Sequence, residues 1–163
     1  MTVDFAPYRL EPFRKEHEKA VVALIEACYS EYGQRIELDT LDSDLLRIEE
    51  TYRAPDGFFR ILIAERKVIG TVAMKGLSHD AAELKRVFLD GAFRGRGLGK
   101  KLSLWAFARA GEGNCTKVDI WSDVLYETAH HLYRGLGARD TGRRRELGGV
   151  NDVDEFCFVL DLT

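Results

Sequence analysis

A glycine-rich segment in the second half of the chain has the residue types of an anion-binding loop. A strand-like run precedes it and a helix-like run follows it, and its sequence is Arg94-Gly95-Arg96-Gly97-Leu98-Gly99-Lys100-Lys101. The first N–H groups of a helix have no partners inside it, and the helix dipole adds positive potential in front of them. Glycine allows a close approach of the backbone, and Arg and Lys add charge-assisted hydrogen bonds. The segment therefore predicts a cradle for a phosphate or a diphosphate.

Two common nucleotide-binding loops do not fit this segment. A Walker A loop requires Gly at position 94 and Ser or Thr at position 101, where the chain has Arg94 and Lys101. The dinucleotide fingerprint G-x-G-x-x-G also fails, because Gly95, Gly97 and Gly99 follow the spacing G-x-G-x-G. A doubly wound fold would moreover begin with this unit, whereas here a long segment precedes it.

The composition is that of one globular domain, which we expect to span residues 1–163. Hydrophobic residues make up 45% of the chain and charged residues 31%, which is ordinary for a globular protein. No apolar run reaches the roughly 20 residues that span a membrane, and the N-terminus lacks the pattern of a signal peptide. The three cysteines are scattered and form no C-x-x-C pair. We therefore expect a cytoplasmic protein without disulfide bonds or a metal site.

The charge distribution favours a compact anionic ligand. The net charge of −3 argues against a general nucleic-acid binder. The basic residues of the loop nevertheless form a local positive cluster on an acidic protein. We expect no nucleic-acid partner and no membrane partner, and the sequence leaves a homodimer open.

The hydrophobic pattern predicts the element order β-α-α-β-β-β-α-β-α-β-β. Val21, Leu24, Ile25 and Cys28 have the spacing of one helix face, and a second helical stripe follows at Leu41, Leu45 and Ile48. Further helices are expected after residue 98 and around residues 126–136. Strands are expected at residues 8–13, 58–64, 68–74, 82–90, 118–121, 139–147 and 153–162. The unit from 82 to 121 requires a parallel crossover, so we expect an α+β fold of three layers with a mixed sheet.

Three segments in this order resemble the GNAT (GCN5-related N-acetyltransferase) superfamily. The loop from Arg94 to Gly99 looks like the family's R/Q-x-x-G-x-G/A acetyl-CoA loop, and residues 82–89 look like its fourth strand. Residues 132–138 are similar to its F/L-Y-x-x-x-G-F signature, with Ala138 in place of the aromatic residue. The resemblance implies a mixed, mostly antiparallel sheet of about seven strands with helices on both faces. Its fourth and fifth strands would be parallel and splayed.

The resemblance also implies an acetyl-CoA-dependent N-acetyltransferase that acts by direct transfer in a ternary complex. The acceptor would be a primary amine of a small molecule or a protein. The backbone of Val87, Phe88 and Leu89 would pair with the pantetheine arm of acetyl-CoA. The diphosphate would bind at the backbone amides of the loop residues Arg94, Gly95, Arg96, Gly97, Leu98, Gly99 and Lys100.

The resemblance also implies catalytic roles for two residues. Glu83 corresponds to a glutamate that takes a proton from the amine, and such a base is needed because an ammonium has no free lone pair. Tyr133 corresponds to a tyrosine that protonates the departing thiolate. Strand alternation predicts that Glu83, Lys85, Val87 and Leu89 share one face. The alternatives are a solvated Glu83 paired with a neighbouring cation, and a Tyr133 that only fills the core.

Other features leave alternatives open. Tyr126 stands where many family members have an Asn that contacts CoA, so we assign it no role. His130 and His131 have no carboxylate or Cys at ligand spacing, and Arg143, Arg144 and Arg145 form either a solvated hairpin or a grip for an anionic acceptor. Acidic residues between positions 26 and 44 either attract a cationic amine or form helix surface. A non-catalytic acyl-CoA-binding module, or an interaction domain whose loop binds nothing, would also carry such a loop.

Overall fold

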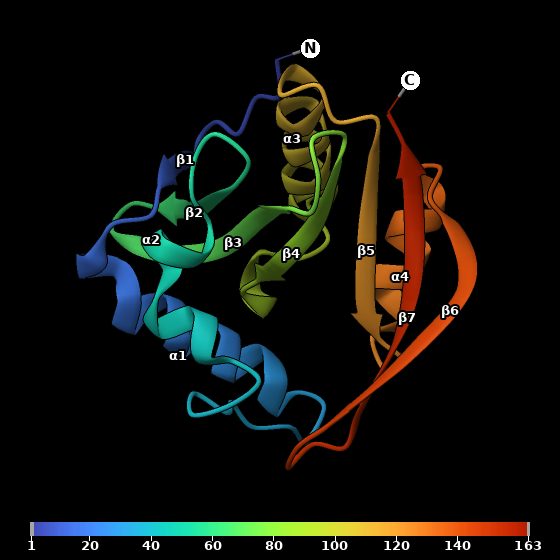
Figure 1. Ribbon diagram of the computed structural model, residues 1–163. Coiled ribbons are helices and arrows are strands. Elements are labelled where there is room, and N and C mark those ends of the chain that lie inside the picture. Colours follow the sequence, from blue (N-terminus) through green and yellow to red (C-terminus); the bar gives the residue numbers. More distant parts are fainter. Residues whose placement is uncertain (1, 163) are drawn as a thin grey trace.

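The computed structural model describes residues 2–162, which form one seven-stranded sheet with helices on both faces (Figure 1). The strand order is β1-β2-β3-β4-β5-β7-β6, and only the β4–β5 pair is parallel. The predicted α+β fold with a mixed, mostly antiparallel sheet is confirmed. The strands are β1 (Arg9–Pro12), β2 (Phe58–Ala64), β3 (Lys67–Gly76), β4 (Ala81–Leu89), β5 (Lys117–Asp123), β6 (Arg139–Gly148) and β7 (Val153–Asp161).

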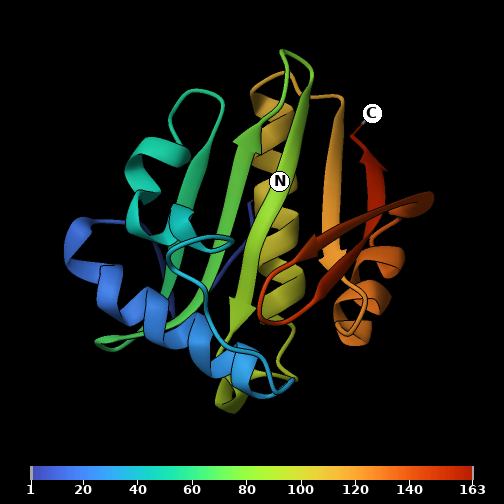
Figure 2. The ribbon, with the colours of Figure 1, turned by 60° about the horizontal axis from the view of Figure 1, so that its bottom comes forward.

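Two long helices cover opposite faces of the sheet. Helix α1 (Glu18–Ser30) lies on one face, whereas α3 (Leu98–Glu112) lies on the other, and α4 (Glu127–Gly135) follows β5 (Figure 2). Each face has its own core, because neighbouring residues of a strand point to opposite sides. Val72 of β3 packs in the core under α3, and the next residue, Ala73, packs in the core under α1. Strands β2 and β3 are therefore buried on both faces.

The predicted second helix is wrong as a continuous element. The segment forms a 3-10 turn, Ser43–Leu46, and a one-turn helix α2, Ile48–Thr51. Arg47 lies between them with φ −143° and ψ 44°, which is not a helical conformation. Leu45 and Ile48 are buried whereas Leu41 is exposed, so the apolar spacing found two of three core contacts and not the break between the two turns.

A β-bulge interrupts β4 at Arg86. Ala73 of β3 lies opposite Lys85, whereas Thr71 lies opposite Phe88, so β4 contains one extra residue. Arg86 has a positive φ of 54°, which is uncommon for a residue other than glycine. The Thr71 hydroxyl donates a hydrogen bond of 2.7 Å to the Arg86 carbonyl oxygen and so holds the bulge in place.

The bulge reverses the side-chain alternation of β4. Lys85 lies opposite Ala73, on the α1 side, and Phe88 also packs in the α1-side core. Val87 and Leu89 pack against the α3-side core. The prediction that Glu83, Lys85, Val87 and Leu89 share one face is therefore wrong, because a regular alternation takes no account of the extra residue.

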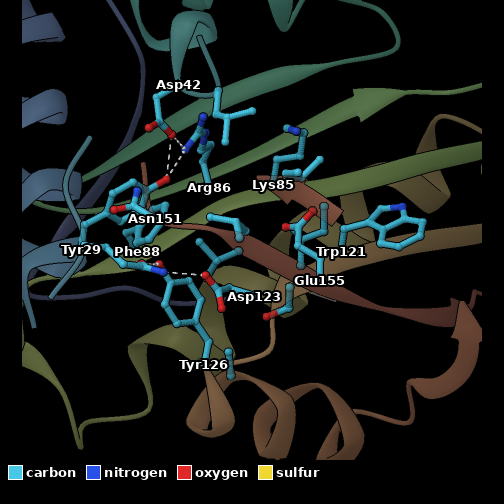
Figure 3. A pocket seen from close by; sticks show the side chains of 18 of the residues that line it. Tyr29, Asp42, Lys85, Arg86, Phe88, Trp121, Asp123, Tyr126, Asn151 and Glu155 are labelled. Atoms are coloured by element: carbon cyan, nitrogen blue, oxygen red, sulfur yellow. Dashed lines mark hydrogen bonds and ion pairs between the residues drawn. The ribbon is translucent and has the colours of Figure 1, made fainter. Parts of the chain in front are cut away.

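The bulge directs the side chain of Arg86 into an ion-pair network beneath the segment that follows α1. Its guanidinium donates hydrogen bonds of 3.0 Å to Asp42 Oδ1 and to the hydroxyl of Tyr29 (Figure 3). A third hydrogen bond, also of 3.0 Å, runs to Asp44 Oδ2. Burial by itself would raise the pKa of Asp44, but the charge and hydrogen bonds of Arg86 bring that pKa below its ordinary value. The network ties the irregular segment between α1 and β2 to the middle of β4.

Replacing Arg86 by methionine should destabilise the fold by about 3–5 kcal/mol, because two carboxylates would be left buried without their cation. The free energy of unfolding in urea measures this change. Arg66→Met, on the exposed β2–β3 turn, is the matched control and should stay within about 0.5 kcal/mol of the parent protein. A loss below about 1 kcal/mol for Arg86→Met would contradict the structural role of the network.

Candidate active site

The β4 and β5 strands pair over three residues only. Ala81, Ala82 and Glu83 lie opposite residues 117–119 of β5. Beyond this point β4 continues along β3 to Leu89, while β5 continues along β7 to Asp123. The two strands separate and leave one edge of β4 without a neighbouring strand (Figure 1). The predicted splay of the fourth and fifth strands is confirmed.

A cavity of about 170 Å³ lies at this separation. It is bounded by β4, the end of β5, the start of α4, the segment after α1 and the β6–β7 hairpin (Figure 3). Four of the predicted site residues line it: Glu83, Val87 and Phe88 from β4, and Tyr133 from the distant helix α4.

Glu83 is the last residue of β4 that pairs with β5, and its side chain lies between two cations. It is 8% exposed. Its Oε2 lies 3.9 Å from Nζ of Lys85, and its Oε1 lies 3.6 Å from Nη2 of Arg145. The neighbouring Arg86 instead pairs with Asp42 and Asp44. Glu83 is thus a buried carboxylate on the cavity wall rather than a solvated strand residue.

Tyr133 lines the cavity from α4. It is 6% exposed, and its ring lies 6.3 Å from that of Phe158. Burial raises the pKa of Tyr133 above the ordinary tyrosine value, so the hydroxyl keeps its proton at neutral pH. None of the hydrogen bonds found within residues 2–162 uses this hydroxyl. The residue therefore packs as a core tyrosine while its side chain borders the cavity.

The glycine-rich loop leaves a row of backbone amides without partners. The first bond of α3 runs from the N–H of Lys101 to the carbonyl of Gly97, at 3.0 Å. In the part of the chain that the structure describes, the N–H groups from Gly95 to Lys100 donate no hydrogen bond to a protein acceptor. Gly95 and Gly97 have φ of 76° and 75°, a conformation that favours glycine, and no atom lies within 4 Å of a Cβ built on either. Open space and unused donors fit a diphosphate group.

The arginine side chains of the loop are engaged with other parts of the protein. Arg94 donates from Nε and Nη2 to the carbonyl of Leu89, at 3.1 and 2.9 Å, and its guanidinium pairs with Glu31, the residue that follows α1. Its backbone N–H is directed at the Gly91 carbonyl, at 3.4 Å. Arg96 donates to the hydroxyl of Tyr8 at 2.7 Å. The free donors of the loop are therefore amides rather than guanidinium groups.

Hydrogen bonds that the sequence did not predict connect the segment after α1 to the end of β5, at the wide end of the opening between β4 and β5. Gln34, in the segment after α1, donates to Asp123 Oδ2 at 2.7 Å and accepts from the hydroxyl of Tyr126 at 2.8 Å. The only signal in the sequence was the unusual residue at position 126. His130, which is 4% exposed, also holds this end of β5, with Nε2 3.0 Å from the Asp123 carbonyl oxygen. Burial lowers the pKa of His130, which favours the neutral ring.

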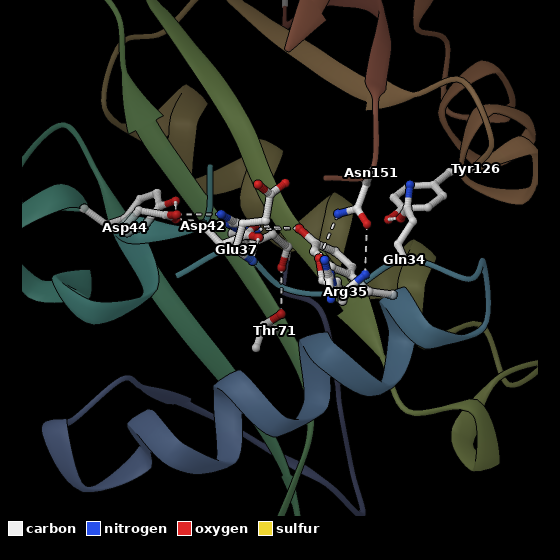
Figure 4. Close-up of polar contacts among 11 residues, drawn as sticks. Gln34, Arg35, Glu37, Asp42, Asp44, Thr71, Tyr126 and Asn151 are labelled. Carbon is white, nitrogen blue, oxygen red and sulfur yellow. Dashed lines mark hydrogen bonds and ion pairs between the residues drawn. The ribbon is translucent and has the colours of Figure 1, made fainter. Parts of the chain in front are cut away.

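The turn between β6 and β7 reaches the same segment and closes one side of the cavity. We call residues 149–152 the strap. The side-chain amide of Asn151 accepts from the N–H of Arg35 at 3.0 Å and donates to its carbonyl at 2.7 Å (Figure 4). Gly149 has φ 75°, and a Cβ there would lie 2.4 Å from Oε2 of Glu37. The positive φ favours glycine, and any larger residue would also have to displace the Glu37 carboxylate.

The three consecutive arginines of β6 do not act as one group. Arg143 pairs with Asp119 at 3.3 Å, and Arg144 pairs with Asp140 at 3.2 Å. Only Arg145 lines the cavity.

Within residues 2–162 no group of three His, Cys, Asp or Glu side chains has the geometry of a metal site. No helix in the same range combines the length and the apolar character needed to cross a membrane.

Comparison with known proteins shows to which family the chain is similar. The model of the acetyltransferase (GNAT) family matches residues 18–138. N-acetylaspartate synthetase of Danio rerio is 31% identical over 121 residues, which are 71% of this chain and 43% of that protein. The chain thus spans less than half the length of this relative.

Solved structures show the same fold. An acetyltransferase from Streptococcus agalactiae superimposes with a TM-score of 0.84 at 23% identity, covering 96% of this chain and 99% of that one. The NatC complex bound to a Gag peptide and CoA gives a TM-score of 0.72 at 20% identity, with 96% and 99% coverage. Family match, splayed strands and glycine-rich loop agree, and the chain belongs to the GNAT family of acetyltransferases.

Proposed function

We propose that this protein transfers an acetyl group from acetyl-CoA to a primary amine, by direct transfer in a ternary complex. The observation that carries the proposal is the meeting of a buried carboxylate, Glu83, and a buried phenol, Tyr133, in one cavity between the splayed strands. A base and an acid at one cavity are what amine acetylation requires, because one proton must leave the ammonium and one must reach the thiolate.

Acetyl-CoA fits the splay and the loop in two ways. The free edge of β4 at Val87, Phe88 and Leu89 offers backbone groups, other than the Leu89 carbonyl that accepts from Arg94, to the amides of the pantetheine arm, as a neighbouring strand would. The unpartnered N–H groups from Gly95 to Lys100 offer donors to the diphosphate. The NatC structure, which contains CoA, has the same fold and supports this assignment.

In this mechanism each residue has one task. Glu83 removes a proton from the ammonium, and the free amine attacks the thioester carbonyl. A backbone N–H near Leu89 stabilises the negative charge on the carbonyl oxygen. As the carbon–sulfur bond breaks, Tyr133 gives its proton to the sulfur. The name of the zebrafish relative refers to an acetylated amino acid, so aspartate belongs in any panel of candidate acceptors.

Replacing Glu83 by glutamine should lower kcat by about 10²–10⁴-fold, because the variant keeps the shape but loses the base. The release of CoA with an accepted amine measures the rate. The variant should recover rate as the pH rises and more of the amine is deprotonated in solution. Glu112→Gln, at the exposed end of α3, should behave as the parent protein. A kcat within twofold of the parent protein would exclude Glu83 as the base.

Replacing Tyr133 by phenylalanine should also lower kcat by about 10²–10⁴-fold while the Kd of acetyl-CoA changes little. The change removes only the hydroxyl, and a tyrosine that merely fills the core would tolerate it. Steady-state kinetics and calorimetric titration with acetyl-CoA separate the two effects. Tyr32→Phe, on an exposed tyrosine, provides the control. Full activity of Tyr133→Phe would show that another group protonates the thiolate.

Replacing Gly97 by valine should weaken acetyl-CoA binding by at least about tenfold, which corresponds to about 1.4 kcal/mol. The side chain would project where the diphosphate is proposed to lie, and φ of 75° is unfavourable for valine. Calorimetric titration gives the Kd, and thermal unfolding checks the fold. Gly111→Val also introduces a side chain into open space, away from the loop, and should bind normally. An unchanged Kd for Gly97→Val would count against the cradle.

A further inference from the structure

Most of the charged side chains around the cavity already have partners of their own. Asp42 accepts from Arg86 at 3.0 Å and from the hydroxyl of Tyr29 at 2.7 Å. Asp123 accepts from Gln34 at 2.7 Å and from the N–H of Leu125 at 2.9 Å. These groups build the wall, and their hydrogen-bonding capacity is largely used.

Lys85 and Arg145, the two cations beside Glu83, differ because each keeps N–H donors without a partner in the described part of the chain. The Nζ of Lys85 lies 3.9 Å from Glu83, and the Nη2 of Arg145 lies 3.6 Å from it, both beyond hydrogen-bonding distance. Among residues 2–162, neither Nζ of Lys85 nor the two Nη atoms of Arg145 donate a hydrogen bond to the protein. Both side chains are partly exposed, at 29% and 35%. Charged donors therefore remain available on both sides of the carboxylate.

Arg145 is held in a fixed orientation. Its Nε donates to Glu155 Oε1 at 2.6 Å, and its guanidinium lies over the ring of Trp121, 4.3 Å from the ring centre. The planar end of an arginine fixed in this way is well suited to bind a carboxylate through two parallel hydrogen bonds. In Figure 3, Lys85, Trp121 and Glu155 lie together at one end of the cavity, away from Tyr126.

We propose that the acceptor is a free α-amino acid, whose ammonium group goes to Glu83 and whose carboxylate is bound by Lys85 and Arg145. The inference rests on the proposed acetyltransferase function. An α-amino acid carries its ammonium and its carboxylate on one carbon atom, which matches a carboxylate between two cations. An amine without a carboxylate would displace water from Lys85 and Arg145 without replacing its hydrogen bonds.

The shape of the site agrees with this class of acceptor. The cavity of about 170 Å³ is smaller than the roughly 300–1,000 Å³ of sites for drug-sized ligands. The strap, bound to Arg35 through Asn151, closes one side of it. The first residue of a polypeptide carries a neutral amide where a free amino acid carries its carboxylate, so a peptide would leave the two cations without a partner.

The reaction balances with groups already assigned. Glu83 takes one proton from the ammonium, the amine nitrogen forms a bond to the acetyl carbon, and the carbon–sulfur bond breaks. Tyr133 supplies the proton that the sulfur takes up. The nitrogen loses its second proton as the amide forms, and this proton restores the Tyr133 hydroxyl, so that one proton in total is released, through Glu83. The products are CoA and an N-acetyl amino acid, which keeps its carboxylate on Lys85 and Arg145 but has lost its positive charge.

The test compares each free amino acid with its own α-amide. The full chain is assayed for CoA release with glycine, alanine, aspartate and lysine, with their α-amides, and with trialanine. We expect kcat/KM for the best free acid to exceed that of its amide by at least about tenfold. Lys85→Met and Arg145→Met should each lower kcat/KM for the free acid by at least about tenfold more than they lower it for the amide. Arg144→Met, the neighbour that does not line the cavity, should preserve the preference.

Amides or trialanine that react as well as the free acids would overturn the proposal, and the parent protein alone suffices for this comparison. An equal loss for acid and amide in both variants would also overturn it, because the two cations would then act only on Glu83. A protein that binds acetyl-CoA but releases no CoA with any amine would instead refute the acetyltransferase function itself.

Discussion

The short pairing between β4 and β5 is the constraint on which the rest of the site depends. Parallel strands normally continue side by side, but here the ladder ends at Glu83 and Asp119. The separation leaves the backbone edge of β4 free and places Glu83 at the narrow end of the opening. It also lets α4 bring Tyr133 to the same cavity. A free strand edge, a buried carboxylate and a buried phenol therefore meet at one cavity because of one departure from regular sheet geometry.

Both strands are held apart by interactions that replace the missing ladder. On the β4 side, the bulge at Arg86 is tied down by Asp42, Asp44 and the hydroxyl of Thr71. On the β5 side, Asp123 is held through its side chain by Gln34 and through its carbonyl by His130. Buried ion pairs give little net stability compared with apolar packing, although breaking one is costly. Their contribution here is to fix the backbone of the splay in one arrangement.

The sequence predicted the parts of the structure that depend on local pattern. The glycine-rich loop, the seven strands and the long helices follow from residue type and periodicity, and Glu83 and Tyr133 do meet at one cavity. The break at Arg47 and the bulge at Arg86 could not be predicted in this way. The bulge belongs to a network that joins positions 42–44 to position 86, and no local window contains both ends. The same holds for Gln34 and Asn151, whose partners lie 89 and 116 residues away along the chain.

A crystal structure with acetyl-CoA would show directly whether the loop and the opening between β4 and β5 hold this molecule. We expect diphosphate oxygens about 2.7–3.2 Å from amides between Gly95 and Lys100, and the acetyl group in the splay between Glu83 and Tyr133. A structure in which acetyl-CoA binds elsewhere, with the splay occupied by the protein's own side chains, would contradict this expectation.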